Sequence, residues 1–148
     1  MKNIHVCCLV VLALSFIGCK TAQFDKQPPF TIVTANYNYW SGGQPGVGGT
    51  KVTIEYTMKN SVEFDSIYFQ KKVVKVALQQ AEGKMYVVGF FNKERSNEVV
   101  GQIDAKTKES VDPFQLAPND AVLSYRSKGK TNYFKVVNLK EVSPAINQ

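Results

Sequence analysis

The sequence predicts an all-β domain of two antiparallel sheets packed as a sandwich. Apolar and polar residues alternate with the period of two that half-buried strands require, most cleanly over residues 51–58. Turn-forming residues recur about every 8–12 positions between such stretches. Beyond the first eighteen residues, no stretch of about 12 residues has the period of an amphipathic helix. We therefore expect seven strands, and an eighth if "EVVGQI" pairs with them.

The first two expected strands flank a glycine-rich stretch. In "TIVTANYNYW" the odd positions form the more apolar face, so Tyr37 and Tyr39 are expected in the core and Trp40 at the end of the strand. In "KVTIEYTMK" the even positions are apolar. The residues expected to point inward are Val33, Ala35, Tyr37 and Tyr39, then Val52, Ile54, Tyr56 and Met58.

Three further strands are expected in the middle of the chain. "VEFDSIYFQ" is apolar and aromatic, with a bend near Ser66, and "KVVKVALQ" is expected to form one strand. Gly83 in "AEGK" can take the positive φ of a tight hairpin, and Gly89 in "KMYVVGFF" is a candidate β-bulge. The inward faces are expected to carry Val74, Val76 and Leu78, then Met85, Val87 and Phe91.

The last expected strands form the clearest hairpin, with "KGK" as its turn. The polar stretch 92–119, with its prolines, interrupts the strand pattern, and we expect Phe114 and Leu116 to pack back onto the sandwich. The topology expected is immunoglobulin-like, although the Cys…Trp…Cys signature is absent, with a small β-barrel as the alternative. The inward residues of the hairpin are expected to be Ala121, Leu123, Tyr125, Tyr133, Val137 and Leu139.

The first eighteen residues have the composition of an export leader. Lys2 precedes an apolar run at 4–17 that would be only about 21 Å long as a helix. A membrane span needs about 20 apolar residues, so the run is too short for one. It ends with Phe16, Ile17 and Gly18 before Cys19.

This ending resembles the lipobox of bacterial lipoproteins, although Phe16 stands where leucine is usual. The resemblance implies that Cys19 carries the lipid, including palmitate, and that cleavage falls between Gly18 and Cys19. It also implies that Lys20 favours the outer membrane. The alternatives are a plain signal peptide or a single-span anchor. We expect a leader at 1–18, a flexible tether at 19–29, the sandwich at 30–142 and a C-terminal tail at 143–148.

The composition of the processed chain disfavours most catalytic chemistry. His5 is the only histidine and would leave with the leader, and Cys19 would be the only cysteine left. Histidine-dependent triads and His-rich zinc sites would then be impossible. The acidic residues of 104–120 match no calcium loop, and lysines greatly outnumber arginines, which disfavours nucleic acid. We expect no enzyme, no cofactor and no nucleic-acid partner.

The stretch "SGGQPGVGGTK" does not match a phosphate-binding loop, because Thr50 and Lys51 stand in the wrong order and a strand follows. It is expected to be a flexible loop or a binding loop on a rigid sandwich. The rings of "YNYW" offer faces for stacking. The candidate ligand contacts are Tyr39, Trp40, Gly43 and Gly46.

The segment from "FQLAPND" to "NLKE" is similar to the C-terminal part of small outer-membrane lipoproteins of unassigned activity. We expect a lipid-anchored, non-catalytic module on the periplasmic or surface side of the outer membrane. It would act as a binding or accessory module with no assigned ligand, and the partners considered are an envelope protein or a glycan. The alternative is a module that binds a carbohydrate or another envelope ligand through Trp40 and nearby tyrosines.

Overall fold

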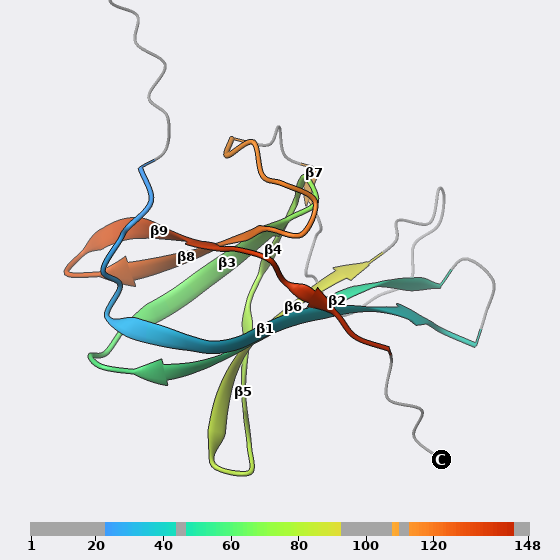
Figure 1. Cartoon of the computed structure of the whole chain (residues 1–148), viewed down its shortest axis with the longest axis horizontal. Coiled ribbons are helices and arrows are strands. Elements are labelled where there is room, and N and C mark those ends of the chain that lie inside the picture. The colour runs from blue at the N-terminus through green and yellow to red at the C-terminus, as the bar shows by residue number, and fades with distance from the viewer. Residues whose placement is uncertain (1–22, 44–46, 93–107, 110–112, 144–148) are drawn as a thin grey trace, which may run out of the picture.

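The computed structural model describes residues 23–43, 47–92, 108–109 and 113–143, and these form two five-stranded sheets (Figure 1). Apolar side chains from both sheets meet in one buried cluster, so the domain is a β-sandwich. In sheet order, the first sheet contains β10 (Lys140–Glu141), β1 (Phe30–Ser41), β2 (Gly48–Met58), β6 (Lys84–Asn92) and β5 (Ala77–Ala81). The second contains β7 (Lys108–Glu109), β4 (Lys72–Lys75), β3 (Glu63–Phe69), β8 (Ala121–Ser127) and β9 (Lys130–Val136).

The topology is immunoglobulin-like, as the sequence predicts. Strands β1-β2-β6-β5 follow the order A-B-E-D of that fold, and β9-β8-β3-β4 follow G-F-C-C′. All neighbouring strands are antiparallel except β1 and β10, which are parallel. The two sheets remain separate, so the alternative of a small barrel is wrong.

Aromatic rings fill one end of the sandwich, which we call the closed end. Phe30 lies among Phe64, Tyr125 and Phe134, with ring centroids 5.0, 5.1 and 5.6 Å away and all three contacts edge-on. Edge-to-face packing adds to the stabilisation that burial provides. These rings come from β1, β3, β8 and β9, so they join the two sheets.

The inward face of β1 differs from the predicted one over its first half. The pairing with β2 skips Val33, since Ile32 lies opposite Tyr56 and Thr34 opposite Glu55. This β-bulge leaves Val33 52% exposed and changes the phase of the alternation. The expectation that Val33 points inward is therefore wrong.

The segment "KVVKVALQ" forms two strands in different sheets and not one. The amide of Val76 donates a hydrogen bond to the carbonyl of Asp65, 3.1 Å away, at the point where the chain leaves β4 for β5. Val74 is buried, whereas Leu78 lies exposed on the other sheet. Met58, at the end of β2, is also exposed, so neither Leu78 nor Met58 is a core residue.

Gly89 is not a bulge, because it pairs in regular register with Val52. A Cβ on Gly89 would lie 3.1 Å from methyl groups of both Ile67 and Val74 in the opposite sheet. The glycine therefore allows close approach of the sheets. The bend expected near Ser66 is present as a register shift between Phe64 and Ser66.

Both predicted hairpin turns are confirmed. Glu82 and Gly83 have φ of 51° and 75°, and Lys128 and Gly129 have the same two values, as in two-residue turns of the I′ type. In β9, however, Phe134 and Val136 face the core, and Val137, just beyond the end of this strand, is exposed. Tyr133 instead packs against rings outside the core cluster. Leu139 is buried as expected, because the positive φ of Asn138 changes the phase beyond β9.

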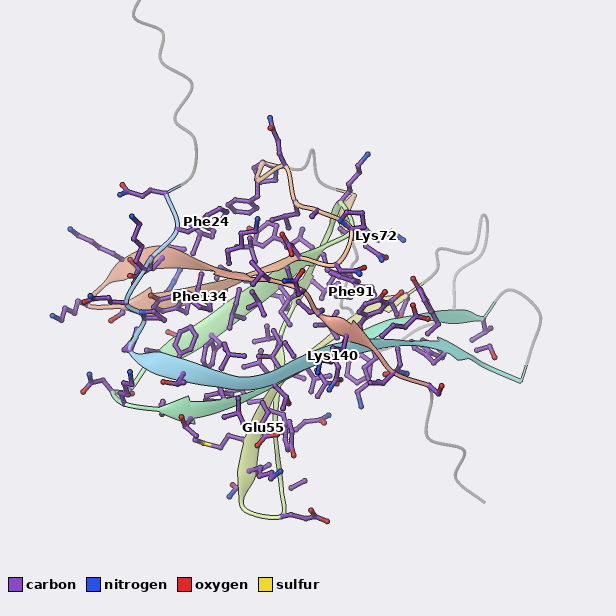
Figure 2. All side chains as sticks on the ribbon, in the orientation of Figure 1. Phe24, Glu55, Lys72, Phe91, Phe134 and Lys140 are labelled. Atoms are coloured by element: carbon purple, nitrogen blue, oxygen red, sulfur yellow. The ribbon has the colours of Figure 1, made fainter. Side chains whose placement is uncertain are left out.

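The outer side of the second sheet carries a smaller aromatic cluster. Phe114 contacts Tyr68, Tyr133 and Phe24, at centroid distances of 4.9, 5.2 and 5.6 Å. Phe114 therefore packs back onto the sandwich, as predicted. Figure 2 shows Phe24 outside the two sheets, and Phe134 and Phe91 toward opposite ends of the sandwich. The segment "EVVGQI" lies outside the described residues.

Residues 23–29, expected as part of a tether, make contacts that a free tether would lack. The amide of Asp25 donates to the carbonyl of Tyr133 at 2.7 Å, and its carboxylate accepts a hydrogen bond from the hydroxyl of Tyr125. The carbonyl of Pro29 accepts bonds from the amides of Lys59 and Asn60. The chain is thus held on the domain from Phe24 onward.

Candidate functional site

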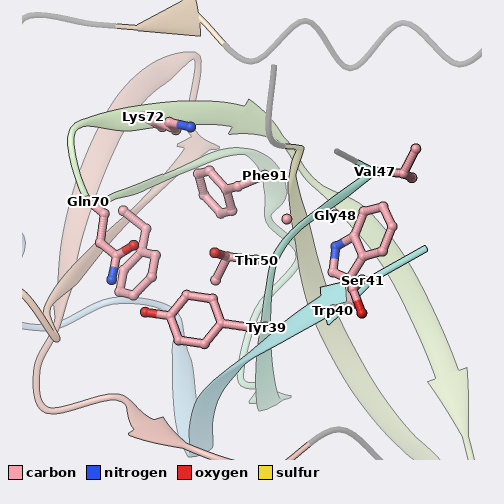
Figure 3. Close-up of a pocket in the computed structure, with 11 residues that line it drawn as sticks. Tyr39, Trp40, Ser41, Val47, Gly48, Thr50, Gln70, Lys72 and Phe91 are labelled. Atoms are coloured by element: carbon pink, nitrogen blue, oxygen red, sulfur yellow. The ribbon is translucent and has the colours of Figure 1, made fainter. Parts of the chain in front are cut away.

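A cleft of about 460 Å³ lies between the sheets at the end opposite the closed end, and we call this the open end. Tyr39, Thr50 and Phe91 are paired neighbours across β1, β2 and β6 and form one wall. The turn between β3 and β4 forms the facing wall (Figure 3). The lining residues are Tyr39, Trp40, Ser41, Val47, Gly48, Gly49, Thr50, Phe69, Gln70, Lys72 and Phe91.

The cleft exists because β1 and β2 run past the turn that ends the opposite sheet (Figure 1). Tyr37 and Tyr39 lie two residues apart on the same face of β1, yet Tyr37 is 4% exposed and Tyr39 is 48% exposed. Tyr37 packs against Phe69 with ring centroids 5.1 Å apart, whereas Tyr39 lines the cleft beyond it. The expectation that Tyr39 is a core residue is therefore wrong.

Tyr37, two residues before Tyr39 on β1, is held in the sandwich by polar contacts. Its hydroxyl lies 3.3 Å from Oδ1 of Asn119 and 3.2 Å from Oε2 of Glu141, within hydrogen-bonding distance of both. Burial, followed by the contact with the Glu141 carboxylate, raises the pKa of Tyr37 above its usual value. Tyr37 therefore stays a neutral donor and links β1 to the segments that precede β8 and form β10.

Trp40 contributes an unusual polar group at the rim of the cleft. Its indole Nε1 is buried, and it has no hydrogen-bond acceptor among the described residues. Figure 3 shows this nitrogen turned toward Gly48. A buried donor without an acceptor costs about 1–3 kcal/mol, so such groups are rare in folded proteins and call for an explanation.

Two glycines of the glycine-rich stretch, Gly48 and Gly49, stand where a side chain would collide with neighbouring backbone. A Cβ on Gly48 would lie 2.8 Å from the carbonyl oxygen of Trp40, and one on Gly49 only 2.2 Å from that of Phe91. Gly49 also lies directly opposite Trp40 in the β1–β2 ladder. The absence of side chains therefore allows the strands to approach.

The facing wall contains strained backbone. Gln70 and Lys71 have φ of 47° and 64°, a region that residues other than glycine adopt only at a cost of about 1 kcal/mol each. Gln70 lines the cleft, and the chain pairs again directly after it, with Lys72 opposite Phe69. The tight turn places the side-chain amide of Gln70 and the ammonium group of Lys72 at the cleft.

The cleft can hold a polar ligand that has a flat apolar face. Tyr39 supplies a partly exposed ring, while Thr50 and Gln70 supply groups that both donate and accept hydrogen bonds. Lys72 is its only charged lining residue in the described part of the chain. No group of three or more potential metal ligands occurs among the residues that the structure describes.

Of the predicted contacts, the structure brings Tyr39 and Trp40 to the cleft. Gly43 lies in open space on the loop and does not line it, and Gly46, Gly18 and Cys19 lie outside the described residues. Sequence reasoning missed the remaining side chains, since they come from β2, the β3–β4 turn and β6. The missed side chains that define the cleft are Thr50, Phe69, Gln70, Lys72 and Phe91.

No family model matches the chain, and searches of curated proteins and of solved structures found no significant match. In the part of the chain that the structure describes, no helix has the length and apolarity needed to span a membrane.

Proposed function

We propose that this chain is a lipid-anchored, non-catalytic binding module of the bacterial outer membrane, with its ligand site in the cleft at the open end. The observation that carries the binding site is the cleft itself, in which the half-exposed ring of Tyr39 faces the β3–β4 turn that holds Gln70 (Figure 3). The absence of histidine beyond His5 supports a role without catalysis.

The lipid anchor is supported by the sequence that ends in Gly18 and Cys19. Cells grown with a labelled fatty acid should incorporate the label into the wild-type chain and not into Cys19→Ser. Equal labelling of the two chains would show that Cys19 is not the modified residue.

In the accessory role, the cleft receives part of an envelope protein. Purification of the lipidated chain from envelopes should recover a partner with the wild type and lose it with Trp40→Ala. The matched control is Phe90→Ala, since Phe90 is an exposed aromatic residue that does not line the cleft. A partner retained equally by Trp40→Ala and the control would exclude the cleft as the docking site.

A carbohydrate ligand is the second candidate, favoured by the half-exposed ring of Tyr39 in the cleft. Trp40 is the only tryptophan, so intrinsic fluorescence reports directly on the cleft. Titration with oligosaccharides from a glycan array should shift this emission, and Tyr39→Ala should weaken the affinity by about tenfold, equivalent to the loss of one stacking contact. An array without any bound glycan would exclude this candidate.

A further inference from the structure

Four exposed cations surround the place where the described chain begins. They are Lys26, Arg126, Lys128 and Lys130, and we call this group the N-terminal corner. Lys26 lies beside the start of β9, and Lys128 and Lys130 lie in the hairpin turn that adjoins it. Within the described chain, none of the four is within ion-pair distance of a carboxylate.

The acidic residues close to this corner do not neutralise it. The Asp25 carboxylate accepts hydrogen bonds from the Tyr125 hydroxyl and the Gln27 amide. Glu63 lies opposite Arg126 in the β3–β8 ladder and is exposed to solvent. Asp65 also lies close enough to Arg126 for electrostatic attraction, but its carboxylate forms an ion pair with Lys75. Apart from that pair, four cations against Asp25 and Glu63 leave the corner positive.

The attachment of Asp25 limits how far this corner can lie from an anchor at Cys19. Asp25 is hydrogen-bonded to Tyr133 and Tyr125, so the free length of chain begins before it. Five residues lie between Cys19 and Asp25, and the six Cα–Cα steps reach about 21 Å at most when fully extended. A tether that ran to Phe30 would reach roughly twice as far.

We infer that the N-terminal corner rests on anionic phospholipid headgroups, with the cleft directed away from the bilayer. This inference depends on the proposed lipid anchor, which brings the corner to the membrane. Cations near an anionic surface each strengthen binding about fivefold. Because β1 runs from the closed end to the cleft, it separates the two surfaces by about 35 Å at 3.3 Å per residue.

The test uses the lipidated chain reconstituted into vesicles with a nitroxide quencher at the headgroups. A fluorophore is placed on Thr131→Cys, which lies at the corner, or on Gly43→Cys, which lies at the open end with free space around its Cβ. In phosphatidylcholine vesicles containing phosphatidylglycerol, the label at residue 131 should be strongly quenched and the label at residue 43 should not. The quenching at residue 131 should weaken in phosphatidylcholine alone and at high salt.

Charge variants separate headgroup contact from mere tethering. Lys128→Gln combined with Lys130→Gln should lower the ratio of docked to undocked chain about 25-fold. The matched control is Lys71→Gln combined with Lys140→Gln, which removes two exposed cations elsewhere and should leave the quenching unchanged.

Each contrary outcome has a definite meaning. Equal quenching at both labels would overturn the orientation, and quenching at residue 131 that ignores phosphatidylglycerol, salt and the corner variants would overturn the headgroup contact. If quenching at residue 131 requires lipopolysaccharide in the vesicles, the corner binds lipopolysaccharide and the proposed contact with phospholipid headgroups is wrong. A chain that fails to float with the vesicles would overturn the lipid anchor, and this inference with it.

Discussion

The two ends of the sandwich are built from similar residues and have different properties. At the closed end, Phe30 from β1 is enclosed by rings from three strands of the opposite sheet. At the open end, Tyr39 from the same strand faces only the β3–β4 turn and stays about half exposed. The difference lies in the length of the facing sheet and not in the side chains.

This comparison teaches that an inward-pointing aromatic residue becomes core only where a second layer covers it. The same alternation along β1 produces a stabilising cluster at one end and a lined cleft at the other. Core and site can therefore be told apart by mutation, since core residues contribute mainly to stability and cleft residues mainly to binding.

The largest expected effect is at the closed end. Phe30→Ala should lower the free energy of unfolding by about 3–5 kcal/mol, because it removes a fully buried ring and leaves a cavity among three others. Urea denaturation followed by circular dichroism measures this loss. A loss below about 1 kcal/mol would contradict the assignment of this end as the main aromatic core.

A smaller effect is expected from the glycines of the open end. Gly49→Ala should cost about 1–3 kcal/mol, since its Cβ would lie 2.2 Å from the carbonyl oxygen of Phe91. Gly43→Ala is the matched control and should stay within about 0.5 kcal/mol, because nothing lies within 4 Å of its Cβ. If both variants unfold at the same urea concentration, the close approach of β2 and β6 is not required.

The attachment of residues 23–29 to the closed end should respond to pH. The hydrogen bond from Tyr125, aided by the Gln27 amide, holds the pKa of Asp25 below its usual value. Because the folded-state pKa is lowered, the ionised Asp25 carboxylate stabilises the fold fully above its unfolded-state pKa of about 3.9. This stabilisation is lost as pH falls through the folded-state pKa. Asp25→Asn should therefore cost about 1 kcal/mol at neutral pH and progressively less below pH of about 4.

Comparison of wild type and Asp25→Asn isolates this group, because the lowered pKa values of Asp65 and Asp120 are common to both chains. The measurement is the free energy of unfolding in urea across the acidic range. A stability difference that does not shrink with acidification would show that the carboxylate charge is not what holds residues 23–29 on the domain.

The smallest effect on stability is expected at Tyr39. Tyr39→Ala should cost less than about 1 kcal/mol, since its ring is half exposed and its only described ring contact is with Tyr37, 5.7 Å away. If its cost in urea denaturation approaches that of Phe30→Ala, the distinction between the two ends fails.

Much of the fold could be predicted because two signals are local. The period of two identified most strands, and Gly83 and Gly129 marked tight turns that the structure contains. The misassigned residues have non-local causes. Val33 lies at a bulge that only the pairing with β2 reveals, and the step at Val76 follows from a bond to Asp65 in another strand.

The site was predictable only in part for the same reason. Tyr39 and Trp40 stood out because they are adjacent aromatic residues in the sequence. Thr50 and Phe91 join them through strand register, and Gln70 through the packing of one sheet on the other. No property of those residue types alone separates them from ordinary strand and turn positions.

The ladder between β1 and β2 has a mechanical consequence for a chain fixed at its N-terminus. It runs without a break in pairing, apart from the bulge, from Phe30 opposite Met58 to Ser41 opposite Gly48. Tension between an anchor before Phe30 and a load held at the cleft would act lengthwise along β1. The cross-strand hydrogen bonds between β1 and β2 would then be loaded together in shear and would not open one at a time. A higher force should therefore be needed to unfold the domain along this direction than to peel the two strands apart.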